Sequence, residues 1–317
     1  MTEKTTTIKS RAGYDILVRY ILDGDEEIVV VMAHGFGSSK ASPTVTLLMK
    51  NLPPNDGESE LPNGESEPPI EIDNLPQSET GIHTRQRIGV VAFDFPAHGE
   101  SPVDGTYLCI ENCINDLASA VDFAKAAAPA ARIINFGSSF GAYITLLYIT
   151  RLNLGGTDAS GLAEDNRFDS DVATVTTAID AASAASLAQP HNLKAFLRSA
   201  AVNMPELFTE PTPEDAELLA RDGYVIKEYD PRNLKITNEF IADLQANNLF
   251  KCFARGDAQL KMIHGTSDRD IDYAKAVAFA TQYNIELITV PGGDHSLSIP
   301  GAPEKVVEEV RKFIGRG

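Results

Sequence analysis

The sequence predicts an α/β protein built on a mostly parallel central sheet. Two observations predict this class: short apolar runs recur along the chain, and several of them end in turn residues that precede helix-start signals. Nearly continuous apolar runs are typical of parallel strands, which are buried on both faces. The runs that we expect to be strands are residues 27–33, 132–136, 173–179, 259–263 and 285–290.

The first of these runs, 27–33, leads into the short loop His34-Gly35-Phe36-Gly37. A plain turn between a strand and a helix would account for this loop. If a nucleophile lies nearby, a loop flanked by glycines can instead present a backbone N–H to the oxyanion that acyl transfer creates. We assign the amide of Phe36 to that role.

Two polar segments interrupt the expected sheet. Residues 53–80 hold eight carboxylates, six prolines and no basic residue, and residues 155–170 form a shorter polar stretch. Such runs bury too little apolar surface to offset their conformational entropy. We expect the first to be an acidic, disordered-like insertion and the second a surface loop, neither of which carries a recognisable motif.

The run 132–136 is followed by the G-S-S-F-G turn of 137–141 and then by an apolar helical stretch. A strand, a sharp G-x-S-x-G turn and a helix, in this order, hold one serine exposed on a strained elbow. Ser139 is therefore the candidate nucleophile, and the amide of Phe140 is the second candidate oxyanion donor. The alternative is a Gly/Ser loop without chemistry, since G-x-S-x-G also occurs by chance.

The stretch before the fourth expected strand is longer than a minimal sheet requires, and it carries signals of short helices. Thr212, followed by a proline, begins one helix that Gly223 ends, and Thr237 begins another. Residues 192–202 are interpreted as a third helical run. The predicted division is a core of residues 1–180 and 259–317 and a helical insertion of residues 181–258.

A serine hydroxyl becomes a good nucleophile only when a base takes its proton and a third group orients that base. In the elbow arrangement the acid and then the histidine follow the serine along the chain. Asp268 comes shortly after the strand at 259–263, and His295 follows the strand at 285–290. Two such strand ends in a parallel sheet should bring both side chains to Ser139.

Three other acids compete with Asp268. Asp270 and Asp272 lie near the start of the next expected helix, where acidic side chains are common. Asp294 is adjacent to His295 in sequence and would point elsewhere. His295 is the only histidine after the acid, so chain order leaves one candidate base.

In order and spacing, these motifs resemble the landmarks of the α/β-hydrolase family. The similarity covers roughly residues 5–150 and 255–315. The chain is most similar to the lidded branch that holds cinnamoyl and feruloyl esterases, monoacylglycerol lipase-like enzymes and serine aminopeptidase-like hydrolases. The matching segments are 34–37, 94–101, 137–141, 264–268 and 292–295.

The resemblance implies helices on both faces of the sheet, no metal or organic cofactor, and a cap formed by the inserted helices. Such a cap excludes water and shapes the acyl pocket. It also implies a structural role for His98, and we interpret His264, at a strand end, in the same way. Phe140 departs from the feruloyl esterases, in which glutamine is common at this place. Apolar residues of the insertion that could line a pocket are Phe196, Leu207, Phe208, Tyr224 and Phe240.

Composition argues against several classes of protein. A chain of 317 residues that is 43% hydrophobic can bury a sizeable core. No stretch approaches the ~20 apolar residues of a membrane span, and the N-terminus lacks the apolar core of a secretory signal. The net charge of −18 argues against nucleic acid as a partner. Cys109, Cys113 and Cys252 show no metal-ligand spacing, so we expect reduced thiols in a cytoplasmic protein.

These observations predict a serine hydrolase, most simply a carboxylesterase (EC 3.1.1.-) acting on a small or medium, uncharged acyl ester. Ser139 would attack the carbonyl, His295 would carry the proton and Asp268 would hold the imidazole. The substrate's identity and the oligomeric state do not follow from the sequence.

Two alternatives stay open. The first is a serine peptidase of the aminopeptidase-like type, whose insertion would hold a free α-amine with carboxylates. The second is a non-catalytic binding protein on the same fold, which is disfavoured because all three catalytic residue types are present. The carboxylates available for the first alternative are Glu206, Glu210, Glu214 and Asp215.

Overall fold

The computed structural model describes residues 2–53, 86–154, 193–230 and 232–315. Most of the expected acidic insertion (54–80 of 53–80), the polar stretch 155–170 and the strand expected at 173–179 lie outside the described residues.

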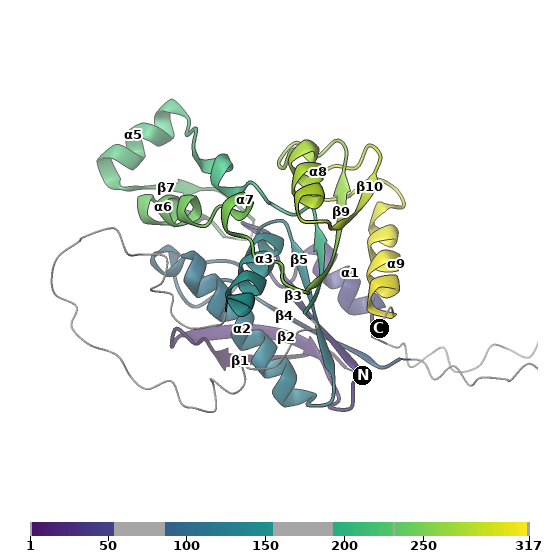
Figure 1. Ribbon diagram of the computed structural model, residues 1–317. Coiled ribbons are helices and arrows are strands. Elements are labelled where there is room, and N and C mark those ends of the chain that lie inside the picture. Colours follow the sequence, from purple (N-terminus) through teal and green to yellow (C-terminus); the bar gives the residue numbers. More distant parts are fainter. Residues whose placement is uncertain (1, 54–85, 155–192, 231, 316–317) are drawn as a thin grey trace, which may run out of the picture.

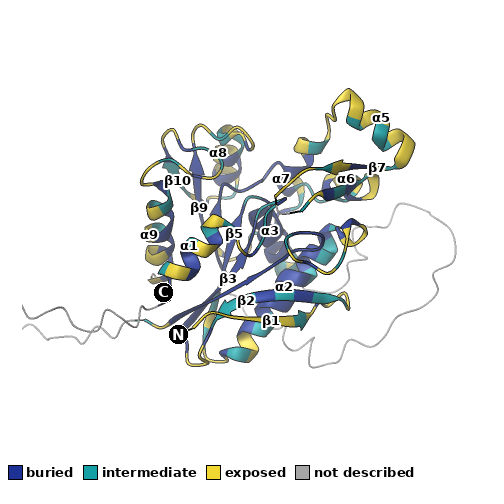
Figure 2. Cartoon of the chain, turned by 180° about the vertical axis from the view of Figure 1, so that it is seen from behind, coloured by how far each residue is buried: buried dark blue, intermediate teal, exposed yellow. Residues whose placement is uncertain are grey.

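An eight-stranded sheet forms the centre of the protein (Figure 1). The first two strands join it antiparallel, and the remaining neighbours pair in parallel, as the predicted class requires. The central strands are buried along their length because helices cover both faces (Figure 2). In spatial order the strands are β1 (Lys4–Lys9), β2 (Asp15–Ile21), β4 (Ile88–Phe93), β3 (Ile28–Ala33), β5 (Arg132–Ser138), β6 (Lys194–Arg198), β9 (Gln259–Gly265) and β10 (Glu286–Val290).

Two apolar clusters lie on opposite faces of the sheet, and β3 contributes to both. Its Val29 and Val31 belong to one cluster, while Val30 and Met32 belong to the other, as expected for side chains that alternate along a strand. The helices on the first face are α2 (Ile110–Ala127), α3 (Phe140–Asn153) and α8 (Tyr273–Gln282). Those on the second face are α1 (Pro43–Asn51) and α9 (Ala302–Gly315).

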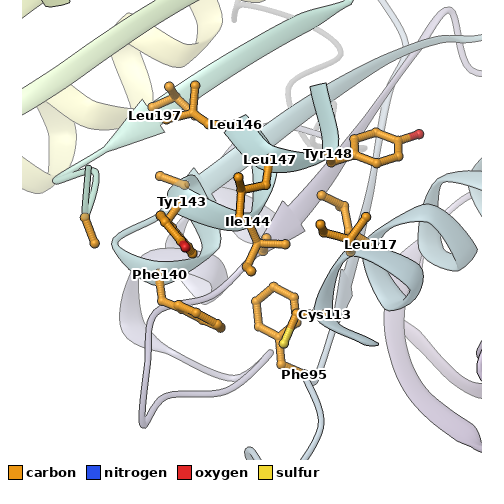
Figure 3. Packing of buried hydrophobic residues seen from close by; sticks show 14 of the residues in the cluster. Phe95, Cys113, Leu117, Phe140, Tyr143, Ile144, Leu146, Leu147, Tyr148 and Leu197 are labelled. Carbon is orange, nitrogen blue, oxygen red and sulfur yellow. The ribbon is translucent and has the colours of Figure 1, made fainter. Parts of the chain in front are cut away.

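Helix α3, which begins directly after the candidate nucleophile, is the most deeply buried helix of the first face. Its Phe140, Tyr143 and Ile144 pack in the same cluster as Cys113 and Leu117 of α2 (Figure 3). Because α3 is anchored in this core, while Ile134 and Phe136 anchor β5 in the cluster on the second face, the turn between β5 and α3 has little freedom to move.

The helical run expected at 192–202 is wrong: these residues contain strand β6, which pairs with β5 on one side and β9 on the other. Hydrogen bonding to two neighbouring strands outweighs the weak helical preference of this short segment. Residues 194–198 of the expected insertion therefore belong to the central sheet. Phe196 cannot line a pocket of the cap, because it packs on Phe136 and Phe313 in the cluster on the second face.

The inserted residues form short helices and one hairpin. Helix α5 (Pro213–Asp222) begins at the N-cap Thr212 and ends at Gly223, whose φ is +77°, as the turn signals predicted. Helix α6 (Asn238–Ala246) begins at the N-cap Thr237, again as predicted. The remaining elements, not expected from the sequence, are a 3-10 helix (Met204–Phe208), β7 (Tyr224–Lys227), β8 (Leu234–Thr237) and α7 (Leu249–Cys252).

Among the described residues, no helix has the length and apolar character needed to cross a membrane.

Candidate active site

The structure brings the three predicted residues together at the carboxyl ends of three parallel strands. Ser139 follows β5, Asp268 follows β9 and His295 follows β10. The His295 Nε2 atom lies 3.0 Å from Ser139 Oγ, and its Nδ1 atom lies 2.8 Å from Asp268 Oδ2. The imidazole thus bridges a hydroxyl and a carboxylate, the geometry in which it can accept the hydroxyl proton.

Ser139 sits on a strained turn. Its φ of 53° and ψ of −115° belong to a region that residues with a side chain rarely adopt. Two glycines allow the strand and helix to approach closely: a Cβ at Gly137 would lie 2.5 Å from Ala142 Cα, and one at Gly141 would lie 2.1 Å from the carbonyl oxygen of Ala33. The elbow therefore depends on the absence of side chains at both positions.

We expect Gly141→Ala to destabilise the protein by about 1–3 kcal/mol or more, because the new methyl group meets backbone atoms that cannot rotate away. The measurement is the urea unfolding midpoint. Gly315→Ala, in α9, is the matched control, since no atom lies within 4 Å of the added methyl group. A Gly141→Ala protein as stable as the Gly315→Ala protein would contradict the close approach at the elbow.

Asp268 has a buried carboxylate that is hydrogen bonded on both oxygens. Oδ1 accepts from the backbone N–H groups of Asp270 and Ile271, each at 2.9 Å, and Oδ2 faces His295 and, at 3.1 Å, Nε2 of His264. Burial by itself raises the pKa of Asp268, but the hydrogen bonds from His264 and His295 outweigh it and hold the pKa well below its usual range. The carboxylate is thus ionised and fixed in place.

None of the three rival acids is hydrogen bonded to His295. Asp272 caps α8 by accepting from the N–H of Ala274, and Asp294 accepts from the backbone and hydroxyl of Ser298. Asp270 is exposed. One of its carboxylate oxygens lies within 4.8 Å of a carboxylate oxygen of Asp268 and a ring nitrogen of His295, a spacing that could hold a metal ion. The Asp268 and His295 atoms are, however, already joined to each other.

The two candidate oxyanion donors both adjoin the nucleophile elbow. A Cβ at Gly35 would be 3.3 Å from that of Ser139, so the loop that carries Phe36 lies against the elbow. Phe140 is the first residue of α3, where helix N–H groups have no partner within the helix. Neither amide donates a hydrogen bond to another of the described residues.

The histidines near the site other than His295 are built into the core. The pKa of His98 is lowered to about 3 by burial, and its Nδ1 lies 2.8 Å from the carbonyl oxygen of Pro96. Burial also lowers the pKa of His34, whose Nε2 accepts from the N–H of Phe95. His98 thus fits the structural role that the resemblance implied.

Two cavities open on either side of Ser139, and both touch Phe36 and His295. The first, which we call the cap cavity, has a volume of about 530 Å³ and lies between the core and the inserted residues. The other, which we call the α1 cavity, has a volume of about 550 Å³ and lies beside α1 and α9. Leu207 and Phe208, two of the five residues expected to line a pocket, border the cap cavity.

Phe240 and Tyr224, two others of that set, lie elsewhere. The Phe240 ring stacks on that of Phe36, with centroids 5.8 Å apart, and it is buried. Tyr224 is on the exposed surface of the insertion, with Lys235 over its ring.

Sequence reasoning missed two residues that hold the histidine loop. Both Arg198 Nη2 and Ser199 Oγ donate to the backbone carbonyl of His295, at 3.1 and 2.8 Å. Arg198 Nη1 also donates to Ser138 Oγ at 2.7 Å, so it connects the elbow to this loop. Recognising β6 as a strand would have placed both residues at the same sheet edge as Ser139.

Comparison with known proteins agrees with this architecture. A model of the alpha/beta hydrolase family matches residues 74–309. The chain is similar to a putative hydrolase from Agrobacterium vitis S4, with a TM-score of 0.67 and 18% identity over 99% of this chain and 100% of that one. It is also similar to Est1E from Butyrivibrio proteoclasticus with ferulic acid bound (TM-score 0.64, 16% identity, 98% and 97% covered).

Alpha/beta hydrolase domain-containing protein 10 from mouse is similar as well, with a TM-score of 0.61 and 12% identity over 98% of both chains. At these identities the likeness to solved structures shows the fold alone. No curated protein matched the sequence.

Proposed function

We propose that this chain, which belongs to the alpha/beta hydrolase family, is a serine hydrolase that cleaves a small or medium carboxylic ester through an acyl-enzyme intermediate. The observation that carries the proposal is the continuous hydrogen-bonded chain from Ser139 through His295 to Asp268, placed between two cavities. We further propose a cytoplasmic carboxylesterase (EC 3.1.1.-), in keeping with the free thiols of its cysteines.

In the first half of the reaction, Ser139 Oγ attacks the ester carbonyl while His295 Nε2 takes its proton. Asp268 holds the Nδ1–H and stabilises the imidazolium that forms. The amides of Phe36 and Phe140 would donate to the oxyanion, and each such donor is worth about 3–4 kcal/mol in comparable sites. His295 then gives the proton to the leaving alcohol.

In the second half, water attacks the acyl-enzyme. His295 takes a proton from this water as the new C–O bond forms, and it returns the proton to Ser139 Oγ when the tetrahedral intermediate collapses. The acid product leaves and the resting state is restored. Protein groups and water supply every proton and electron pair in this scheme.

The cap cavity supports an uncharged, apolar acyl group. Most of its described lining is apolar, and Phe36 and Phe208 meet there edge to face with their centroids 5.8 Å apart. The Est1E structure holds ferulic acid, an aromatic acid. An aromatic or alkyl acyl group of similar size would bury its surface against these rings.

A specific observation keeps a peptidase as the second candidate. Glu210, Asp215 and Asp270 border the cap cavity, where a free α-amine of a peptide could bind. Asp215 already forms an ion pair with Lys227 at 2.5 Å, which leaves two exposed carboxylates for an amine. Glu206, which the sequence also suggested, pairs with Lys275.

A panel of substrates on the purified protein tests the proposal. We expect turnover of p-nitrophenyl esters with short and medium acyl chains, and inhibition of that turnover by a fluorophosphonate. Arylamides of amino acids with a free amine are the comparison. If they are hydrolysed and the esters are not, the peptidase is correct; if neither is hydrolysed and no probe reacts, the binding-protein alternative is correct.

A further inference from the structure

The α1 cavity and the cap cavity differ in the sign of their charge. Of the described residues that line the α1 cavity, Arg198 is a cation and none is a carboxylate. The cap cavity is bordered by three carboxylates and one lysine. A substrate with an anionic group would therefore place it on the α1 side of Ser139.

Arg198 is a buried cation whose hydrogen-bond partners do not neutralise it. The residue is 5% exposed, and its two hydrogen bonds go to neutral acceptors, the Ser138 hydroxyl and the His295 carbonyl. No carboxylate among the described residues forms an ion pair with its guanidinium. Burying an unpaired charge is costly, so such a group is usually paired.

The charge persists at neutral pH. Burial lowers the pKa of Arg198 to about 10, and the more distant charges of Asp268 and Asp294 favour its charged form. Both of these carboxylates are bound elsewhere, Asp268 to His295 and Asp294 to Ser298. A guanidinium has five N–H donors, and two are used here, so three remain for a ligand.

The rest of the α1 cavity also suits an anion. Ser42, Pro43 and Thr44, at the start of α1, line it, and α1 has no acidic residue in its first turn. A helix N-terminus carries a partial positive charge, although in α1 Pro43 has no N–H and the N–H of Val45 already donates to Ser42 Oγ. The hydroxyl group of Ser38 borders the same space and can donate a hydrogen bond, whereas that of Ser298 already donates to Asp294.

We propose that the α1 cavity binds a carboxylate of the substrate through Arg198, so that the enzyme acts on esters with an apolar part and an anionic part. The inference rests on the proposed ester hydrolysis and deepens it. The apolar part would occupy the cap cavity, as the sequence-based expectation of an uncharged acyl group requires. The anionic part would occupy the α1 cavity. This proposal replaces the expectation that the whole ester is uncharged.

A purely positioning role for Arg198 makes a different prediction. Because Arg198 connects Ser138 to the His295 carbonyl, its loss could simply loosen the base. In that case all esters would be cleaved more slowly by the same factor. A carboxylate-binding role changes the ratio between charged and neutral substrates.

The test compares esters that share one apolar acyl group and carry a carboxylate on the alcohol part with their carboxamide counterparts, which have the same shape without the charge. We expect the wild type to have a kcat/KM about 10- to 100-fold higher for the carboxylate substrate than for its carboxamide counterpart. One charge-assisted hydrogen bond accounts for a difference of about this size. Arg198→Gln should remove this preference. Arg198→Lys, which keeps the charge, should retain part of it.

Ser199→Ala is the matched control, because Ser199 donates to the same His295 carbonyl but carries no charge. We expect it to slow both members of each pair equally and to keep their ratio. If Arg198→Gln behaves in the same way as Ser199→Ala, Arg198 only positions the base and the proposal is wrong.

A measurement on the wild type alone does not depend on how the variants fold. Glutarate should inhibit hydrolysis of a neutral ester competitively and at least tenfold more strongly than glutaramide. Equal inhibition, with neutral esters still hydrolysed, would overturn the carboxylate site while leaving the proposed hydrolase intact. Loss of all ester hydrolysis and of fluorophosphonate labelling would overturn the hydrolase itself.

Discussion

Ser139→Ala should lower kcat for ester hydrolysis by about six orders of magnitude, the size of effect seen when a catalytic serine is removed. The hydroxyl that lies 3.0 Å from His295 Nε2 would be absent, so no acyl-enzyme could form. Any rate that remains would come from the oxyanion donors and substrate binding. The measurement is kcat with a p-nitrophenyl ester, together with mass-spectrometric identification of the residue that a fluorophosphonate labels.

Ser138→Ala is the control for this experiment. Ser138 carries the neighbouring hydroxyl, but its Oγ accepts from Arg198, whereas the hydroxyl at His295 Nε2 is that of Ser139. We expect the Ser138→Ala enzyme to be labelled at Ser139 as the wild type is. Labelling that persists in Ser139→Ala would show that another serine is the nucleophile.

Asp268→Asn should lower kcat by about four orders of magnitude with the fold retained. The amide oxygen could still accept from the N–H groups of Asp270 and Ile271, but its NH₂ would donate to His295 Nδ1. The imidazole would then carry its proton on Nε2, facing Ser139, and could not act as a base. The kcat of the variant, with circular dichroism to check the fold, is the measurement.

The neighbouring acids provide the controls. Asp270→Asn should be nearly neutral because the side chain is exposed, and Asp272→Asn should be nearly neutral because asparagine also caps a helix. If either variant is as slow as Asp268→Asn, the assignment of the acid is wrong.

The contribution of Asp268 to the free energy of unfolding should depend on pH in the acid range. The fold holds the pKa of this carboxyl well below its value in the unfolded chain, so the unfolded state binds a proton more readily as the pH falls. The carboxylate therefore stabilises the fold above a pH of about 4, and this contribution is lost progressively as the pH falls further. We expect the stability difference between wild type and Asp268→Asn to shrink below that pH.

The sequence by itself determined the features that depend on a few neighbouring residues. The elbow was predictable because Gly137 and Gly141 are the positions where a Cβ would meet the backbone of an adjacent element. The starts of α5 and α6 were predictable because a capping side chain bonds to an N–H three residues away, and the end of α5 because Gly223 adopts a left-handed conformation. Chain order also named Ser139, Asp268 and His295, three residues that the structure brings together.

Only the tertiary structure decided what depends on partners far along the chain. The segment that contains β6 carries no strong local signal, and it is a strand because β5 and β9 flank it. Arg198 meets groups that lie 60 and 97 positions away, so neither its burial nor its contact with the His295 loop could be predicted. Helix caps and turns are decided within one turn of chain, whereas strand pairing, and the charge that a cavity presents, depend on which distant segments the fold places side by side.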